Sequence, residues 1–139
     1  MKLVIDASVA VEYLLRTPLG LRVAGMLEQA HLLAPEALDA DVLAVLRRYV
    51  LAGMLTEARA GEAVTDLGDW GVERLPHAPL LSGAWELRHD VTAFDALYVA
   101  AAKQYEVPVV TADGPLSRAP VGGVVVQNVR ALGPAGAPA

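Results

Sequence analysis

The chain of 139 residues can form one domain with a hydrophobic core but is too short for two. It has no cysteine, which excludes disulfides and thiolate metal sites, and its net charge of −5 argues against a generic polyanion-binding protein. Hydrophobic residues make up 55% of the chain. Charged residues nevertheless interrupt every apolar run before the roughly 18 residues that a membrane-spanning helix needs, so we expect a cytoplasmic protein with no membrane segment.

Short apolar runs, helical periodicity and glycine or proline breaks predict strands that alternate with helices. In chain order, the predicted elements are a strand over 3–5, helices over 6–15 and 18–30, a strand over 31–34, helices over 35–52 and 56–67, a strand over 72–75, helices over 79–88 and 92–105, and strands over 107–111 and 123–129. Pro35 is expected in the first turn of its helix. Strands separated by helices indicate parallel crossovers.

This order of elements predicts an α/β fold, namely a three-layer α/β/α sandwich around a parallel sheet of about five strands. We expect the folded domain to cover residues 1–129. Residues 130–139 consist mostly of alanine, glycine and proline, so we expect them to form a disordered C-terminal tail.

Four aspartates adjoin buried apolar segments of the predicted fold. Asp6 and Asp113 follow predicted strands, whereas Asp41 and Asp95 lie in the first turns of predicted helices. In a parallel α/β sheet, the carboxyl ends of the strands and the starts of the crossover helices meet at one edge. We therefore expect the four carboxylates to converge in one pocket of hard oxygen ligands, which suits Mg²⁺ or Mn²⁺ and chemistry on phosphate esters.

Each aspartate also has a purely local interpretation. Asp6 fits a helix N-cap, Asp95 follows a threonine by three residues as in a capping box, and Asp113 precedes Gly-Pro in a turn sequence. Asp41 and Asp39 lie at opposite edges of the apolar stripe of their helix, so periodicity does not choose between them. Caps and turns do not require their residues to gather at one sheet edge, so we favour a shared site.

Four segments carry a resemblance to a known family: Ile5-Asp6-Ala7-Ser8, the stretch from Pro35 through Asp41-Val42 to Leu46-Arg47-Arg48, Thr92-Ala93-Phe94-Asp95-Ala96-Leu97-Tyr98-Val99-Ala100, and Val110-Thr111-Ala112-Asp113-Gly114-Pro115-Leu116. They resemble the PIN domain, and most of all the VapC toxins of bacterial toxin–antitoxin pairs, over residues 1 to about 129. The family usually carries glutamate where this chain has Asp41. Aspartate is one methylene shorter, so direct metal ligation and a water-bridged role both stay open at that position.

The resemblance implies a Mg²⁺- or Mn²⁺-dependent endoribonuclease toxin that an antitoxin protein silences. Asp6 and Asp95 would be the principal ligands of the ion, and Asp113 would complete the metal site. Asp41 would support them as the fourth catalytic acid, and Thr111 would hydrogen-bond within the cluster. Such an ion polarises the scissile phosphate and lowers the pKa of a bound water. This route needs no ribose 2′-hydroxyl, so the RNA products should carry 5′-phosphate and 3′-hydroxyl ends.

An acidic pocket that cleaves RNA must also attract it, so basic residues should border the pocket. The nearest in sequence are Arg88 and His89, just before the predicted helix of Asp95, and Arg118, just after Asp113. We expect RNA contacts among these three residues, with Arg16 and Arg47 or Arg48 as further candidates. Any one of them taken singly fits an ordinary solvated surface residue better.

Protein partners are also expected. The regions 19–33 and 43–55 carry more apolar residues than one helix face buries within a domain, which indicates a homodimer and a groove for an antitoxin segment near the active site.

One alternative stays open because Asp41 stands where the family usually carries glutamate. It is a PIN fold that is catalytically weak or inactive and acts as an RNA-binding or scaffold module. A phosphoacceptor receiver domain is disfavoured, because Asp6 has no acidic neighbour. A haloacid-type phosphatase is disfavoured because Ser8 stands where a second aspartate is required.

Overall fold

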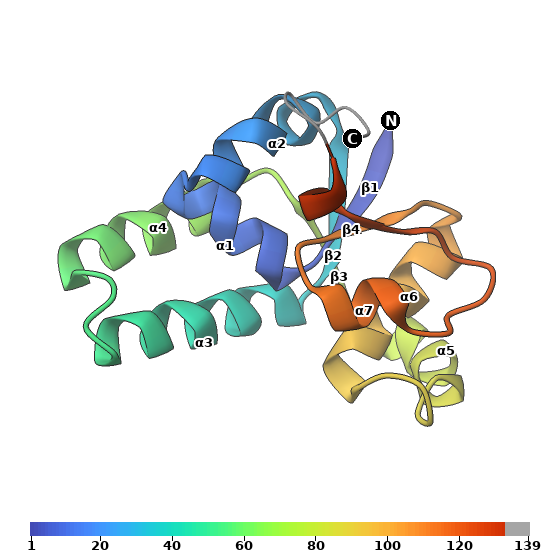
Figure 1. Cartoon of the computed structure of the whole chain (residues 1–139). Helices are drawn as coiled ribbons and strands as arrows, with labels where there is room; N and C mark the ends of the chain where they lie inside the picture. The colour runs from blue at the N-terminus through green and yellow to red at the C-terminus, as the bar shows by residue number, and fades with distance from the viewer. Residues whose placement is uncertain (133–139) are drawn as a thin grey trace.

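The computed structural model describes residues 1–132, which contain a five-stranded sheet in the order β3-β2-β1-β4-β5 (Figure 1). Every neighbouring pair of strands is parallel. The strands are β1 Lys2–Ile5, β2 His31–Pro35, β3 Glu73–Leu75, β4 Val109–Thr111 and β5 Val126–Asn128. The predicted α/β class with a parallel sheet of about five strands is confirmed.

Helices pack on both faces of this sheet and extend beyond it. They are α1 Ala7–Leu15, α2 Pro18–Gln29, α3 Ala37–Leu51, α4 Glu57–Asp69, α5 Leu81–Glu86, α6 Ala93–Tyr105 and α7 Gly114–Arg118, with short 3₁₀ turns η1 Ala78–Leu80 and η2 Val129–Ala131. Helices α3 and α4 run out to one side as an antiparallel pair, whereas α5, α6 and α7 gather on the other (Figure 1).

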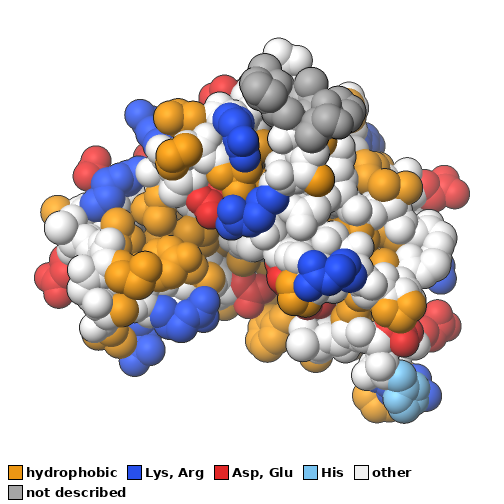
Figure 2. All heavy atoms as spheres, in the orientation of Figure 1, with side chains coloured by type: hydrophobic (Ala, Val, Ile, Leu, Met, Phe, Trp, Pro, Cys, Tyr) orange, Lys and Arg blue, Asp and Glu red, His pale blue; other side chains and the backbone are white. Residues whose placement is uncertain are grey.

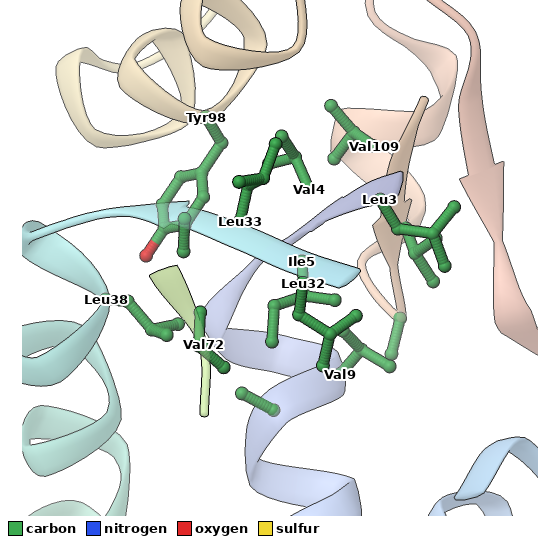
Figure 3. Close-up of a cluster of buried hydrophobic side chains, with 14 of the residues drawn as sticks. Leu3, Val4, Ile5, Val9, Leu32, Leu33, Leu38, Val72, Tyr98 and Val109 are labelled. Atoms are coloured by element: carbon green, nitrogen blue, oxygen red, sulfur yellow. The ribbon is translucent and has the colours of Figure 1, made fainter. Parts of the chain in front are cut away.

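The core lies on the two faces of the central strand β1, whose apolar residues are almost completely buried. Side chains alternate between the faces, as the period of a strand requires. Figure 3 shows Val4 and Leu33 on the side of Tyr98 from α6, and Leu32 on the side of Val9 from α1. A strand covered on both faces must be apolar throughout, which is why the continuous run at the start of the chain indicates an interior strand.

The contact between α1 and α2 depends on a glycine. A Cβ atom at Gly20 would lie 2.0 Å from the backbone carbonyl oxygen of Glu12, a distance that no side chain can occupy. Thr17 caps α2 by accepting a hydrogen bond from the Gly20 N–H at 3.0 Å. The small residue therefore lets the second helix start directly against the first.

Three local predictions need correction. Pro35 ends β2 instead of opening a helix, because it pairs with Leu75 and the next N–H, that of Glu36, donates to the Leu75 carbonyl at 2.9 Å. The helix predicted over 79–88 is split between η1 and α5 and ends at Glu86. The predicted turn after Asp113 continues as the short helix α7, with Pro115 in its first turn, where a missing N–H costs nothing.

The C-terminal boundary lies later than predicted. Arg130, which the sequence assigns to the tail, donates from Nε to the Ala112 carbonyl at 3.0 Å, and Leu132 is buried. The packed domain therefore extends at least to Leu132, and the rest of the predicted tail, residues 133–139, lies outside the described residues. Within residues 1–132, no helix combines the length and hydropathy needed to cross a bilayer.

Candidate active site

A pocket of about 230 Å³ lies where β1 leads into α1, and it brings together the four aspartates that the sequence singles out. Asp6 directly follows β1, and Asp113 lies two residues beyond β4. Asp95 lies in the first turn of α6, and Asp41 comes from the second turn of α3. Figure 2 shows acidic side chains in the hollow at the centre of the molecule, with Lys or Arg side chains beside it. The four carboxylates thus meet at the carboxyl edge of the sheet.

Asp6 is the most buried of these acids, with 5% of the residue exposed. Its Oδ1 accepts hydrogen bonds from Ser8 Oγ at 2.6 Å and from the Val9 N–H at 3.2 Å, and its Oδ2 accepts one from Thr111 Oγ. Asp6 is therefore an N-cap and a pocket residue at the same time. Burial raises the pKa of Asp6, the three donors oppose that change, and the charge of Asp95 adds to it.

Asp95 is only partly buried but faces two other acids. Burial raises the pKa of Asp95 first, and the negative charge of Asp113 raises it further, with a smaller contribution from Asp41. Thr92 caps α6 by accepting from the Asp95 N–H at 3.2 Å, so the predicted cap is present. A hydrogen bond from Thr92 to the Asp95 side chain also opposes the rise in the pKa of Asp95, and that side chain lines the pocket.

The structure distinguishes the two acids of α3. Asp41 lines the pocket and accepts a 2.7 Å hydrogen bond from the phenol of Tyr98, a buried residue of α6. Asp39 points elsewhere and pairs with Arg74 at 3.0 Å. Burial and the bond to Asp41 both raise the pKa of Tyr98, so the phenol stays protonated and acts as a donor.

Two hydroxyl groups link β1 to β4 beneath the acids. Thr111 Oγ donates to Asp6 and accepts from the Asp113 N–H at 2.9 Å. Ser8 Oγ donates to Asp6 and accepts from the Ala112 N–H at 2.9 Å. The sequence points to Thr111 through the family resemblance but not to Ser8, whose only signal is its place two residues after Asp6.

The donor set fits a divalent cation by its chemistry. Within residues 1–132, none of the ion pairs involves a pocket aspartate, so burial and mutual repulsion, which raise the pKa of Asp6 and Asp95, are not offset by an ion pair. Hard carboxylate oxygens in such a pocket suit Mg²⁺ or Mn²⁺. In the same range, however, no three acidic or histidine side chains form a group that could hold an ion as they stand. Direct ligation by three aspartates therefore needs side-chain rotation and stays a prediction.

The predicted RNA-contacting residues lie around the acids but not within their pocket. Arg88 and His89 line a neighbouring pocket of about 390 Å³ that shares Asp95 with the first. The Arg88 guanidinium also stacks on Trp85 at 4.8 Å from the ring centroid. Arg118 folds back so closely that a Cβ on Gly114 would lie 2.6 Å from its Nη1.

Two further residues line the acidic pocket itself: Arg48 from α3, which the sequence offers only as an alternative to Arg47, and Phe94 from α6, to which the sequence assigns no role. Arg48 is the next residue of the same helix face after Asp41, Ala44 and Val45, and all of these line the pocket. Both the Arg48 and the Phe94 side chain are exposed to solvent, and a single sequence does not predict which exposed side chains border a pocket.

The structure thus defines an α/β protein with a parallel sheet and an acidic pocket at its carboxyl edge, and comparison with known proteins identifies the family. The family model for the PIN domain matches residues 3–122. The chain is 40% identical over 119 residues to Ribonuclease VapC1 of Mycobacterium tuberculosis, a match that covers 84% of this chain and 90% of that protein. The chain therefore belongs to the PIN domain family, and its resemblance to the VapC proteins is confirmed.

Solved structures show the same fold at low sequence identity. VapBC2 from Rickettsia felis, solved bound to a DNA fragment from its promoter, superimposes with a TM-score of 0.62 at 16% identity, covering 92% of this chain and 98% of that one. VapC20 from Mycobacterium tuberculosis, described as a sarcin-ricin loop cleaving toxin, superimposes with a TM-score of 0.61 at 17% identity, covering 83% and 92%.

Proposed function

We propose that this protein is a divalent-metal-dependent endoribonuclease, the toxin of a toxin–antitoxin pair, that hydrolyses RNA phosphodiesters at the pocket of Asp6, Asp41, Asp95 and Asp113. The observation that carries the proposal is the convergence of four carboxylates from four segments in one pocket, without an ion pair to any of them within residues 1–132. The names of the relatives support RNA as the substrate, since VapC1 is named a ribonuclease and VapC20 is described as a sarcin-ricin loop cleaving toxin. We propose that this protein acts in the cytoplasm.

Asp6, Asp95 and Asp113 are the residues that would hold Mg²⁺ or Mn²⁺. When bound, the ion would supply charge to polarise the scissile phosphate and would make a water more acidic. The chain contributes rigid placement of its carboxylates. Ser8 and the Val9 N–H occupy Oδ1 of Asp6, and Thr111 occupies one acceptor position of Oδ2, so Oδ2 keeps one position for the ion.

Asp41 has a supporting role in this proposal. The Tyr98 phenol holds one of its oxygens and thereby keeps the shorter acid oriented toward Asp95. The other oxygen stays available to orient a water or a ligand of the ion. The hydroxyl of Thr111 acts on Asp6 and does not need to touch RNA.

The proposal is tested by cleavage of a mixture of structured and single-stranded RNAs with Mg²⁺, with Mn²⁺ and with EDTA. We expect cleavage with either metal and none with EDTA, and products with 5′-phosphate and 3′-hydroxyl ends. Asp95→Asn should lower the rate at least about 100-fold, the effect of losing a central catalytic group. Asp39→Asn is the matched control, because Asp39 is an acid of the same domain that pairs with Arg74 outside the pocket.

Two results would contradict the nuclease proposal. Cleavage that survives Asp95→Asn would indicate a contaminating nuclease, and RNA binding without cleavage in either metal would favour the alternative of an inactive RNA-binding or scaffold module. The matched control separates a loss of pocket chemistry from a general loss of folding.

We also propose an antitoxin partner that binds the groove between α3 and α4. This groove has a volume of about 300 Å³, and most of its lining is apolar: Leu43, Leu46, Val50, Leu51, Ala60 and Val64. Leu51 is 69% exposed, which is costly for a leucine in a free protein. Helix α3 carries the groove on one face and Asp41 on another, so a segment in the groove would end close to the acids. An antitoxin arginine that enters the pocket would compete with the metal.

A homodimer is proposed through the apolar groove between α5 and α6, which has a volume of about 570 Å³ and includes Leu81, Trp85 and Leu97. Trp85 is 68% exposed there, an arrangement typical of an interface anchor. Multi-angle light scattering should give twice the monomer mass, and Trp85→Arg should reduce it. A monomer at micromolar concentration would remove the proposal.

A further inference from the structure

Phe94 is an exposed aromatic residue at the edge of the acidic pocket. It is the single phenylalanine of the chain, and 57% of it is exposed. It lies in the first turn of α6, directly before Asp95, and lines the pocket. Within residues 1–132 it belongs neither to the core nor to the partly buried side chains packed against the core. Folding of the monomer therefore gives no reason for a phenyl ring at this position.

Arg48 faces the same pocket from a different element. It is exposed, and it lies one turn beyond Ala44 and two turns beyond Asp41 on the same face of α3. None of the ion pairs within residues 1–132 uses Arg48. Its guanidinium carries five N–H donors and forms no ion pair with a carboxylate of residues 1–132, so it is suited to pair with a phosphate.

The two side chains border one space that is lined by small residues. Ala7, Ala44 and Val45 leave room between α1 and α3, and Phe94 closes the space from α6. An aromatic face, a free guanidinium and small apolar residues are the components with which proteins hold one nucleotide of a single strand, the ring against the base and the cation against the phosphate.

We propose that Phe94 and Arg48 form a nucleotide subsite beside the scissile phosphate, in which the ring stacks on a base and the guanidinium pairs with the adjoining phosphate. This inference depends on the proposed ribonuclease function. The subsite selects unstacked, single-stranded RNA, because a base within a duplex cannot reach the ring. Arg48 also supplies positive charge at the edge of a pocket whose acids repel the RNA backbone.

The test uses a fluorescein-labelled single-stranded RNA 12-mer and a series in which each base in turn is replaced by an abasic site. Binding is measured by anisotropy in EDTA, where the proposed reaction does not proceed. Phe94→Leu keeps the apolar character but removes the aromatic face, and we expect about tenfold weaker binding, within the range measured for loss of one stacked base. Phe94→Tyr keeps the ring and should bind like the wild type.

The abasic series identifies the contact. At the position that stacks on Phe94, the abasic substitution should weaken RNA binding to the wild type. The same substitution should hardly change binding to the Phe94→Leu protein, because that protein already lacks the stacking ring. Arg48→Gln should weaken binding at every sequence and reduce the slope of log K against log salt by about 0.7. Tyr105→Leu is the matched control, because it removes a 39% exposed aromatic ring from the last turn of the same helix, and it should change nothing.

Three results separate this inference from the proposed function. If the wild type cleaves RNA and Asp95→Asn does not, but Phe94→Leu binds RNA as the wild type does, the subsite is wrong and the nuclease stands. If every abasic substitution lowered the binding free energy of Phe94→Leu as much as that of the wild type, the stacking contact would also be wrong. A change in oligomeric mass for Phe94→Leu, with unchanged RNA binding, would show that the ring belongs to a protein interface instead.

Discussion

Replacing Asp6 with asparagine should make the metal-free protein more stable at neutral pH although it removes a residue of the proposed metal site. Burial raises the pKa of Asp6, so the ionised carboxylate is less favourable in the folded chain than in the unfolded chain. Asparagine has nearly the same shape and carries no charge. The folded state then no longer has to bury that charge or hold it near Asp95.

The size of the effect follows from the hydrogen bonds of Asp6. An asparagine Oδ1 can keep the bonds from Ser8 and the Val9 N–H, whereas Nδ2 cannot accept from Thr111 and must donate to its Oγ instead. The bonds to Oδ1 lose their charge assistance, which costs about 1 kcal/mol and offsets part of the gain. We expect a net stabilisation of about 0.5–2 kcal/mol, the usual range for relieving a functional site. At this chain length, that corresponds to a melting temperature roughly 2–6 °C higher.

Thermal unfolding in EDTA and in Mg²⁺ measures both parts of the prediction. Wild-type protein should gain stability with metal, by about 2.7 kcal/mol at a concentration 100 times the dissociation constant, and Asp6→Asn should gain little. Asp39→Asn serves as the control, because it removes a carboxylate paired with Arg74 and should lower stability by less than about 1 kcal/mol.

A melting temperature several degrees lower for metal-free Asp6→Asn than for the metal-free wild type would contradict this prediction. That result would mean that the hydrogen bonds of the carboxylate outweigh the cost of its burial. Equal metal-induced stabilisation of wild type and Asp6→Asn would instead remove Asp6 from the metal site.

Three further predictions concern pH, the tyrosine and the helix contact. Because folding raises the pKa values of Asp6 and Asp95, the folded state binds more protons than the unfolded state at pH values between the ordinary carboxyl pKa and the raised values. The metal-free protein should therefore become more stable as the pH falls through that window. A loss of stability there, measured by calorimetry, would contradict this prediction. Tyr98→Phe removes the hydrogen bond to Asp41, so it should destabilise the protein by about 1–2 kcal/mol and weaken Mn²⁺ binding measured by calorimetric titration. Unchanged Mn²⁺ binding would show that this hydrogen bond is not needed to orient Asp41. Gly20→Ala should lower the free energy of unfolding, measured with urea, by about 2 kcal/mol or more, because its Cβ would collide with a backbone carbonyl of α1. Gly25→Ala is the control and should cause no such loss, because its added Cβ meets nothing within 4 Å.

Much of the site was predictable because it depends on local sequence and on one rule of topology. Asp6 and Asp113 follow apolar β-branched runs, which form interior strands wherever a parallel sheet is built. The carboxyl ends of such strands lie at one edge, so the two acids had to lie near each other. The N-cap of α6 at Thr92 was also predictable, because a cap depends only on neighbouring residues.

Other features depend on partners far away in the chain. Ser8 and Thr111 are 103 residues apart in sequence, yet their hydroxyl oxygens lie 3.2 Å from each other. Pro35 was placed in a helix because its role as the last strand residue depends on Leu75 of β3. Helical periodicity cannot supply such contacts, since it describes only one element at a time.

Local patterns in the amino-acid sequence suffice to predict the alternation of strands and helices, the buried central strand and the set of acids that such a sheet brings to one edge. The choice between the two acids of α3 depends on packing, because Arg74 pairs with Asp39 and Tyr98 donates to Asp41. Packing also decides that Phe94 and Arg48 border that pocket, since exposure depends on what every other element covers. Periodicity places a residue on a face, but the neighbours that meet that face are chosen by the packing of the whole domain.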